Sequence, residues 1–120
     1  MVKKETPTLS PQCHKHVQGI KDAQDLLNGK WKLIIVSTLF YHGALRFMDL
    51  QRHIGAIAPK VLSGELRDLE LNHLVKRTVY DTKPVTVEYE LLPLGESLSE
   101  VVKVLGKWGV QYREEVVQRG

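Results

Sequence analysis

The sequence predicts an α+β fold that is mainly helical, and the main evidence is a change of apolar rhythm midway along the chain. From Pro59 to Asn72, leucines recur every three or four residues, the spacing that places side chains on one side of an α-helix. From residue 85 to residue 91, apolar and polar residues alternate, as they do in a half-buried β-strand. This order predicts a helix followed by a β-hairpin.

The helix expected over 59–72 has a cationic side opposite its leucines. Lys60, Ser63 and Arg67 fall on that side, together with the small residue Gly64. Lys83 lies in the turn expected between the two strands. A helix that is apolar on one side and basic on the other, next to a hairpin with a lysine at its tip, is typical of a winged helix-turn-helix that binds DNA. The hairpin would be the wing.

Length and composition indicate one domain. The chain has 120 residues and is 42% hydrophobic, enough for one core of ordinary size. Residues 1–12 contain two prolines in Thr-Pro-Thr and Ser-Pro steps with few apolar residues, so we expect a flexible N-terminal arm, and residues 13–120 should form the single domain. No apolar run reaches about 18 residues, so we expect no transmembrane helix and a cytoplasmic protein.

Charge and cysteine content constrain the function only weakly. The formal net charge of +3 is compatible with a nucleic-acid partner but also with many others. Between residues 51 and 90 the basic and acidic residues are equal in number, so their positions on the helix must decide. One cysteine excludes a disulfide within the chain and leaves open a bridge between two copies.

The N-terminal half should contain three helices before the basic one. The first is expected over Val17–Leu27, because Asn28-Gly29 is a good C-terminal cap. The apolar run 33–36 fits a buried strand or a buried helix, and we assign residues 31–40 to a helix that ends at Gly43. Ala44-Leu45 could form a short strand, and a third helix should begin near residue 47 and close at Gly55. Pro59 then suits the first turn of the basic helix.

A last helix should run from about Leu94 to Val116, because apolar residues keep helical spacing over this range. Its length would be roughly 35 Å, more than this core can cover. We therefore expect its distal half to pack on a second copy and form a symmetric dimer. The interface residues would be Val101, Leu105, Trp108 and Tyr112. Alternatively, two glycines near its middle could let the helix fray after Trp108.

A series of ordered landmarks resembles the HxlR family of bacterial transcriptional regulators. The landmarks are Cys13, Leu27–Trp31, Gly43, Arg46–Phe47, Leu50, Ile57, Lys60–Leu62, Leu66–Glu70, Leu74–Arg77, Pro84–Val85, Val87–Tyr89 and Leu94–Gly95. The resemblance implies a dimeric winged helix-turn-helix related to the MarR group. In such a protein the basic helix would enter the major groove, and the terminal helices would form the dimer.

Three positions depart from the family pattern. Ala58 stands where a capping Ser is usual before the basic helix, and Leu92 replaces a Thr that would cap the next one. His73 replaces a usual Gly, and we expect Asn72 to adopt the left-handed conformation in its place. These departures affect helix ends and the wing angle, not the fold.

Candidate DNA contacts follow from this architecture. Lys60, Ser63 and Arg67 could contact base edges or phosphates from the basic helix. Lys83 would reach the adjacent minor groove or its phosphates. Backbone positioning contacts are expected from further cations at the starts of helices: Arg46, Lys30 and Lys32.

The remaining polar and aromatic residues have competing interpretations. For each candidate cation the alternative is an ordinary solvated charge. Arg77 faces the same side as Val75 and Val79, so a structural pairing with Glu88 or another acid competes with DNA contact. The large aromatic residues are most simply interpreted as core or dimer packing: Trp31, Phe47, Trp108 and Tyr112.

Cys13 lies in a Cys-His-Lys-His cluster close to the first helix. A structural zinc site needs four ligands, so one thiol per chain makes a poor metal site, and we expect no metal. A thiolate near Lys15 and a helix start would be stabilised and would react faster with oxidants, which makes Cys13 a candidate redox sensor. The alternative is an idle thiol, and His42, His53 and His73 are too scattered to propose as a site.

No catalytic constellation is present in the sequence. It lacks a phosphate-binding Gly loop, a zinc-protease helix and a nucleophile elbow, so we expect no enzyme, no catalytic residues and no cofactor. The prediction is a homodimeric transcriptional regulator on a pseudo-palindromic double-stranded DNA operator, with a small-molecule or redox signal. The resemblance implies repression more often than activation. The alternative is a winged-helix module that binds protein, and the salt dependence of binding separates the two.

Overall fold

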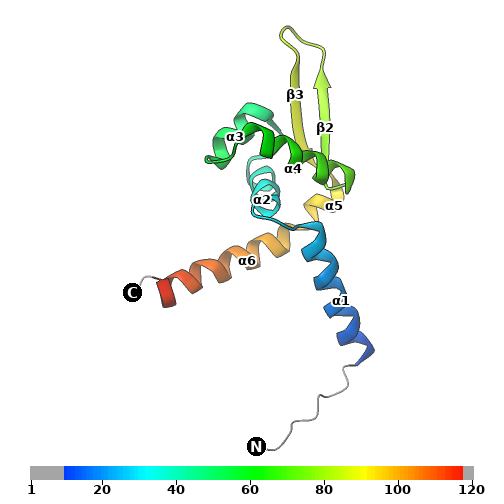
Figure 1. Cartoon of the computed structure of the whole chain (residues 1–120), viewed down its shortest axis with the longest axis vertical. Helices are drawn as coiled ribbons and strands as arrows, with labels where there is room; N and C mark the ends of the chain where they lie inside the picture. The colour runs from blue at the N-terminus through cyan, green and yellow to red at the C-terminus, as the bar shows by residue number, and fades with distance from the viewer. Residues whose placement is uncertain (1–9, 118–120) are drawn as a thin grey trace, which may run out of the picture.

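The computed structural model describes residues 10–117, and Figure 1 shows a helical body from which a hairpin and two terminal helices project. The helices are α1 (Pro11–Leu26), α2 (Lys32–His42), α3 (Phe47–Ile54), α4 (Pro59–Leu71), α5 (Pro93–Glu96) and α6 (Ser99–Tyr112), with a π-helical turn, η1 (Arg113–Val117), after α6. The strands are β1 (Leu45–Arg46), β2 (Val75–Tyr80) and β3 (Thr86–Leu91). The predicted α+β fold, mainly helical, with a winged helix-turn-helix order of elements, is confirmed.

The core lies between α2, α4 and the base of the hairpin. Ile35 and Val36 of α2 are completely buried, so the ambiguous run 33–36 is a helix, as predicted. The leucine stripe of α4 is also buried, which confirms the predicted inner side of that helix. The core side chains are Ile35, Val36, Leu39, Leu50, Ile57, Leu62, Leu66, Leu69, Leu74, Val75, Tyr89 and Val102.

Helix α1 begins six residues earlier than expected. Pro11 takes its first position, and the Ser10 side chain accepts a hydrogen bond from the Cys13 amide at 3.1 Å. Pro11 and Gln12 therefore belong to the helix and not to the arm expected over 1–12, because a Ser-Pro step suits a helix start as well as an extended arm. The rest of that arm, residues 1–9, lies outside the described residues.

The sheet has three antiparallel strands in the order β1-β3-β2. Leu45 of β1 pairs with Tyr89, and β2 pairs with β3 from Val75 opposite Leu91 to Tyr80 opposite Thr86. The predicted short strand at 44–45 is shifted by one residue. β2 and β3 extend beyond the helices as a two-stranded wing (Figure 1), with Lys83 in the turn between them.

The turn between α4 and β2 differs from the expectation in one residue. His73, not Asn72, adopts the left-handed conformation, with a φ of 64°. Asn72 keeps a φ of −94° while its side-chain amide donates to the Asp68 carbonyl at 3.0 Å. The amide of Leu74 donates to the Leu69 carbonyl, so the left-handed residue falls one position later than Asn72.

The expected single helix over 94–116 is divided into α5 and α6. The Leu98 amide donates to the Gly95 carbonyl at 3.1 Å, which closes α5 before α6 begins at Ser99. Gly95 is buried against the Leu74 carbonyl, so the first turn is held to the base of the wing. Helical structure continues through η1, and the expected alternative of fraying after Trp108 is wrong.

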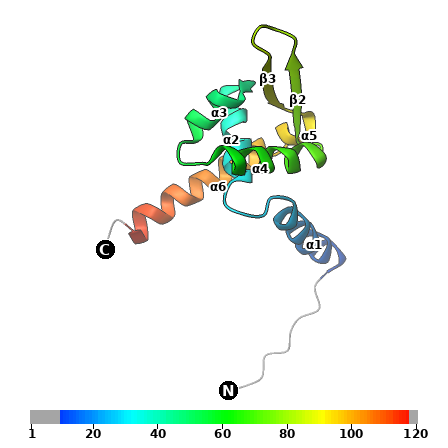
Figure 2. The same cartoon turned by 45° about the horizontal axis from the view of Figure 1, so that its top comes forward.

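The two terminal helices extend from the body in different directions. In Figure 2, α1 and α6 both project from the side of the helical body that lies opposite the wing. No residue of α1 is buried, whereas Val102 of α6 reaches the core. Within residues 10–117 no helix is long and apolar enough to cross a membrane.

Candidate nucleic-acid interface

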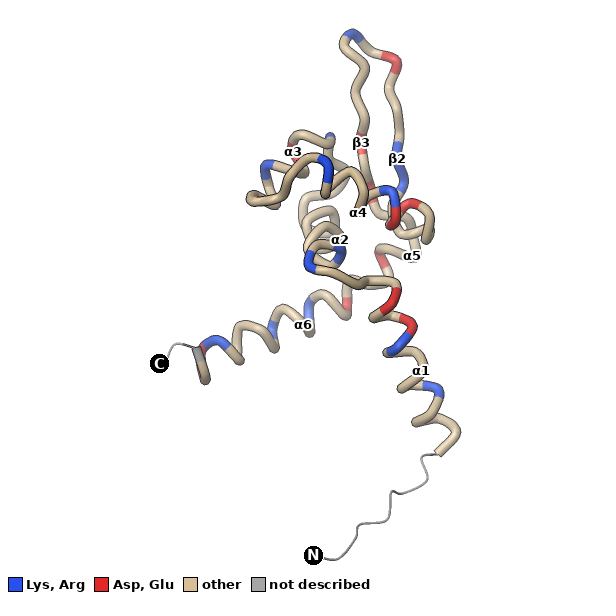
Figure 3. Tube along the Cα trace, viewed as in Figure 1, with Lys and Arg blue, Asp and Glu red and all other residues tan. Residues whose placement is uncertain are grey.

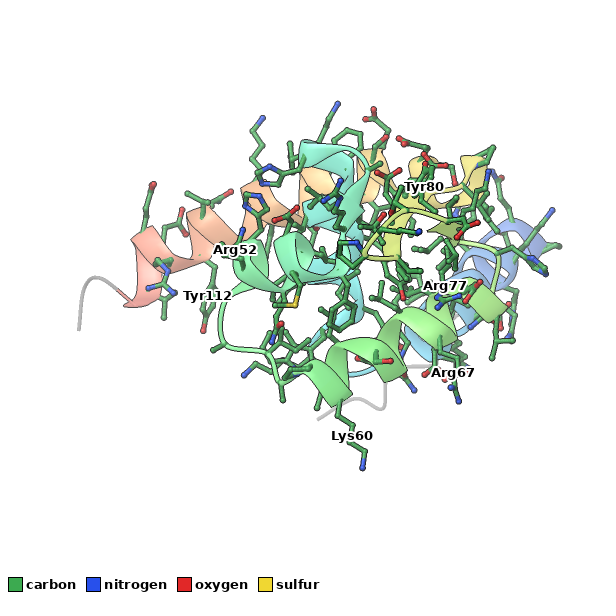
Figure 4. All side chains as sticks on the ribbon, turned by 90° about the horizontal axis from the view of Figure 1, so that it is seen from above. Arg52, Lys60, Arg67, Arg77, Tyr80 and Tyr112 are labelled. Atoms are coloured by element: carbon green, nitrogen blue, oxygen red, sulfur yellow. The ribbon has the colours of Figure 1, made fainter. Side chains whose placement is uncertain are left out.

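The outer side of α4 carries the cations expected to meet DNA. Lys60, Ser63 and Arg67 are exposed, whereas Leu62 and Leu66 on the inner side are buried. In Figure 4, Lys60 and Arg67 both extend from α4 away from the helical body. Neither side chain forms an ion pair with a carboxylate in residues 10–117. Their charges are therefore free to meet a polyanion.

The start of α4 has no side-chain cap. Ala58 occupies the cap position, so the first amides of α4 receive no side-chain hydrogen bond. Pro59, in the first turn, removes one of these unsatisfied donors. The preceding turn is fixed by Gln51, whose side-chain amide donates to the Ile57 carbonyl at 3.1 Å. α3 thus sets the entry of α4, as the first helix of a helix-turn-helix does.

Lys32 does not belong to the DNA-facing surface, and its expected backbone contact is wrong. The residue is 5% exposed, and its Nζ lies 2.7 Å from Glu65 Oε1 and 3.3 Å from Asp68 Oδ2, both on α4. Nζ also donates to Asn28 Oδ1 at 3.2 Å, just before α2. Tertiary contact, not position in the sequence, therefore determines its role.

The environment of Lys32 favours its charged form. Burial lowers the pKa of this amine, but its hydrogen bonds with Glu65 and Asp68 and their negative charges raise it by more, so the net pKa lies above the ordinary value of 10.5. The side chain stays cationic at neutral pH and is neutralised by α4. Local sequence patterns could not predict this cluster, because Glu65 lies 33 residues from Lys32 along the chain.

The other candidate cations remain at the surface. Arg46 is exposed at the position before α3, and Lys83 is exposed in the wing turn. Lys30 is exposed, and its Nζ lies 4.8 Å above the Trp31 ring. Figure 3 shows basic residues on α4, at the base of β2 and at the wing turn.

The structural pairing considered for Arg77, with Glu88 or another acid, does not form as an ion pair within residues 10–117. Glu88 instead accepts a hydrogen bond from the Tyr80 hydroxyl at 3.2 Å, and this bond raises the pKa of Tyr80 above 10.0. Arg77 pairs across the strands with Tyr89. It lines a polar hollow with residues of α4, which the sequence pattern did not predict.

Cys13 is exposed in the first turn of α1. The structure does not bring together three His, Cys, Asp or Glu side chains as a metal site anywhere in residues 10–117. His42 and His53, too far apart in the sequence to propose as a site, have stacked rings with centroids 4.0 Å apart. Trp31 and Phe47 pack against the core.

The residues expected at a dimer interface form an exposed apolar side of α6. Trp108 and Tyr112 stack with ring centroids 5.5 Å apart, and both remain largely exposed. Val101 and Leu105 also line a groove of about 1010 Å³ between α1, α2 and α6.

Comparison with known proteins agrees with this geometry. A family described as HxlR-like helix-turn-helix matches residues 26–117. YkvN of Bacillus subtilis, an HTH-type transcriptional regulator, is 36% identical over 102 residues, which cover 85% of this chain and 86% of YkvN. An HTH-type regulator of Halalkalibacterium halodurans is 41% identical over 86 residues, covering 72% of this chain and 76% of the relative.

Solved structures show the same fold. The redox regulator HypR in its reduced form superposes with a TM-score of 0.73 at 34% identity, covering 83% of this chain and 98% of HypR. HypR has also been solved in an oxidised form. The reduced form of YodB from B. subtilis superposes with a TM-score of 0.69 at 29% identity over 90% of this chain and 98% of YodB, and YodB has also been solved with bound quinone.

A helix with a cationic outer side on a helix-turn-helix scaffold, followed by a projecting hairpin, defines a winged helix-turn-helix transcriptional regulator that binds DNA. The family match covers most of the chain, and the chain belongs to the HxlR-like helix-turn-helix family.

Proposed function

We propose that the protein is a homodimeric, sequence-specific repressor that acts in the cytoplasm on a pseudo-palindromic operator. Each copy would place α4 in the major groove and the wing turn at the adjacent minor groove. The observation that carries this proposal is the exposed, unpaired cationic side of α4 beside the projecting wing. Lys60, Ser63 and Arg67 would read or position the DNA from α4, and Lys83 and Arg46 would contact its backbone.

Lys30 is a weaker candidate for backbone contact. Its ammonium lies over the Trp31 ring, in the connection between α1 and α2. A cation held against an aromatic ring keeps its charge and can still approach a phosphate at the edge of the interface. We retain it as a peripheral contact with a small effect.

The dimer proposal is supported by the apolar surface of α1 and α6. Trp108 is 59% exposed, and Ile20 of α1 is exposed to the same extent. Apolar side chains also line the groove between α1, α2 and α6. Contiguous exposed apolar surface of this kind favours a protein interface. A second copy is the economical partner, because a two-fold axis would space two α4 helices about one DNA turn apart.

A thiol signal is supported by the exposure of Cys13 and by the likeness to HypR and YodB. α1 carries Cys13 and also lines the groove expected at the dimer interface. Oxidation or alkylation of Cys13 would therefore alter the angle between the two copies and hence the spacing of their α4 helices.

The test is a gel-shift titration of the dimer on the DNA upstream of its own gene at two salt concentrations. Operator binding should weaken steeply as salt rises, because several phosphate contacts release counterions. A Lys60→Ala, Arg67→Ala double variant should lose at least about tenfold in affinity. Unchanged binding by that variant would contradict the assignment of α4, and salt-independent binding to a protein would favour the interaction-module alternative.

The signal is tested by repeating the titration with an added oxidant. Wild type should lose or gain operator affinity, and Cys13→Ser should not respond. A wild type that binds equally well with and without the oxidant removes the thiol signal for that reagent and leaves DNA binding intact.

A further inference from the structure

A polar hollow lies between α4 and the wing, and no role has yet been assigned to it. It has a volume of about 290 Å³ and is lined by Ser63, Arg67 and Glu70 of α4, Arg77 of β2 and Tyr89 of β3. Arg77 and Tyr89 are cross-strand partners, so both side chains stand on the face of the hairpin that looks toward α4. Figure 4 shows Arg67 and Arg77 close to the C-terminal half of α4.

The two arginines of this hollow are free. Neither Arg67 nor Arg77 has an ion-pair partner within the part of the chain that the structure describes. Two guanidinium groups that converge without carboxylates in contact leave many N–H donors for an anion. Glu70 also lines the hollow, so its net charge is about +1 with both arginines counted. That charge matches one singly charged anion.

Tyr89 lines the hollow from the β3 side. It is 7% exposed, and its side chain makes no hydrogen bond within residues 10–117. The residue therefore offers a phenolic O–H that no group in residues 10–117 uses. The Ser63 hydroxyl is a second neutral donor on the α4 side.

The geometry of B-DNA indicates which anion would lie at the hollow in a complex with DNA. A helix in the major groove and a wing in the adjacent minor groove are separated by the sugar-phosphate backbone that divides the two grooves. The hollow lies between those same two protein elements. A backbone phosphodiester carries one negative charge, as the hollow requires.

We propose that Arg67 and Arg77 together bind one backbone phosphodiester, between the groove read by α4 and the groove met by the wing. This inference rests on the proposed function of α4 and the wing. Arg67 approaches the phosphate from the helix and Arg77 from the strand, so one phosphate ties the two elements together. Arg77 contributes affinity and fixes the register of the protein on DNA, but it does not read sequence.

The first test compares Arg77→Gln with Lys76→Gln. Lys76 is the adjacent residue on the opposite face of β2, so the control removes the same charge from the same strand. Arg77→Gln should weaken binding by about tenfold, for operator and unrelated duplex alike, and should lower the salt slope by about 1. Lys76→Gln should leave the salt slope unchanged. Urea unfolding of both variants checks that their folds are intact.

The second test locates the phosphate. Operator duplexes carrying one neutral methylphosphonate at successive positions should reveal one position in each half-site that weakens wild type but not Arg77→Gln. The phosphate site is wrong if Arg77→Gln binds DNA with the same affinity and salt slope as Lys76→Gln. It is also wrong if every methylphosphonate that weakens wild-type binding weakens Arg77→Gln binding too. Neither result would contradict DNA binding itself. If wild type binds no duplex, the proposed function fails first.

Discussion

Lys32 shows at the scale of one residue how a partner distant in the sequence determines a role. Its position at the start of α2 resembles that of a phosphate-binding lysine, yet Glu65 and Asp68 of α4 neutralise it. The same amine donates to Asn28, in the connection between α1 and α2. Lys32 therefore holds α4 against α2 and the α1–α2 connection.

Replacing Lys32 with Met should lower the free energy of unfolding by about 1–3 kcal/mol, because Glu65 would be left partly buried without its partner. Urea unfolding measures this loss. The salt slope of DNA binding should not change, since Lys32 meets no phosphate. A Lys32→Met, Glu65→Met double variant removes both charges and should recover most of the stability. A slope lowered by about 1 in the single variant would show a phosphate contact after all.

The stability that Lys32 provides should depend on pH. The folded pKa is raised above the ordinary value of 10.5, so the folded state favours the protonated amine. The contribution is then fully present below pH 10.5 and is lost as pH rises through the folded pKa. Urea unfolding of wild type and Lys32→Met on both sides of that pH should show their difference shrinking at the higher value. A constant difference would contradict the ion pair.

Gly64 allows a test of how closely α4 approaches DNA. A Cβ added there meets no atom within 4 Å, so the free protein has room for alanine. Gly64→Ala should stabilise the fold by about 1 kcal/mol, because glycine weakens a helix interior. If the α4 backbone lies against a base pair, the same variant should bind operator less tightly. Equal operator affinity would mean that Gly64 is only tolerated.

At the scale of elements, the junction of α5 with the wing decides the angle of the hairpin. Gly95 of α5 packs so closely on Leu74 at the start of the hairpin that a Cβ there would overlap the Leu74 carbonyl. The Leu92 amide also donates to that carbonyl at 2.9 Å. Side-chain caps are missing at Ala58 and Leu92, so tertiary contacts hold these helix starts.

Gly95→Ala should destabilise the protein by about 1–3 kcal/mol, because backbone atoms must move to admit the methyl group. Gly106→Ala is the matched control, since a Cβ there meets nothing within 4 Å. The control should be neutral or stabilising by up to about 1 kcal/mol. Thermal unfolding distinguishes the two variants, and equal melting temperatures would show that α5 can shift freely.

At the scale of the whole molecule, the rest of the domain covers only a small part of α1 and α6. They extend from the side opposite the wing (Figure 2), and α6 leaves a row of apolar side chains exposed. The proposed DNA-binding and dimerisation surfaces thus lie on opposite sides of the molecule. In the proposed dimer, a change at α1 would reach α4 through the relative orientation of the two copies.

Trp108→Asp should convert the proposed dimer to a monomer, because a charge would enter the apolar interface. Light scattering after size exclusion measures the mass, and operator affinity should fall with the loss of the second half-site contact. Val110→Asp is the matched control, since Val110 is equally exposed but lies about 200° around α6. A dimeric Trp108→Asp would place the interface elsewhere.

Local sequence patterns were sufficient for much of the fold. The leucine spacing predicted α4, and the apolar–polar alternation predicted β3. Both elements are confirmed. The outward cations of α4 followed from the same periodicity. These features depend on neighbours within one or two turns, so the sequence alone determined them.

Tertiary structure decided whatever depended on partners far along the chain. Only the packing of α2 on α4 turned Lys32 into a buried ion-pair residue. Only the placement of the hairpin beside α4 put Arg77 in a hollow with Arg67. Likewise, only the tertiary structure showed that Gly95 packs on Leu74 and that the expected C-terminal helix is divided into α5 and α6. The physical reason is that periodicity specifies which side of an element is buried, whereas the identity of the groups facing it depends on how the elements pack.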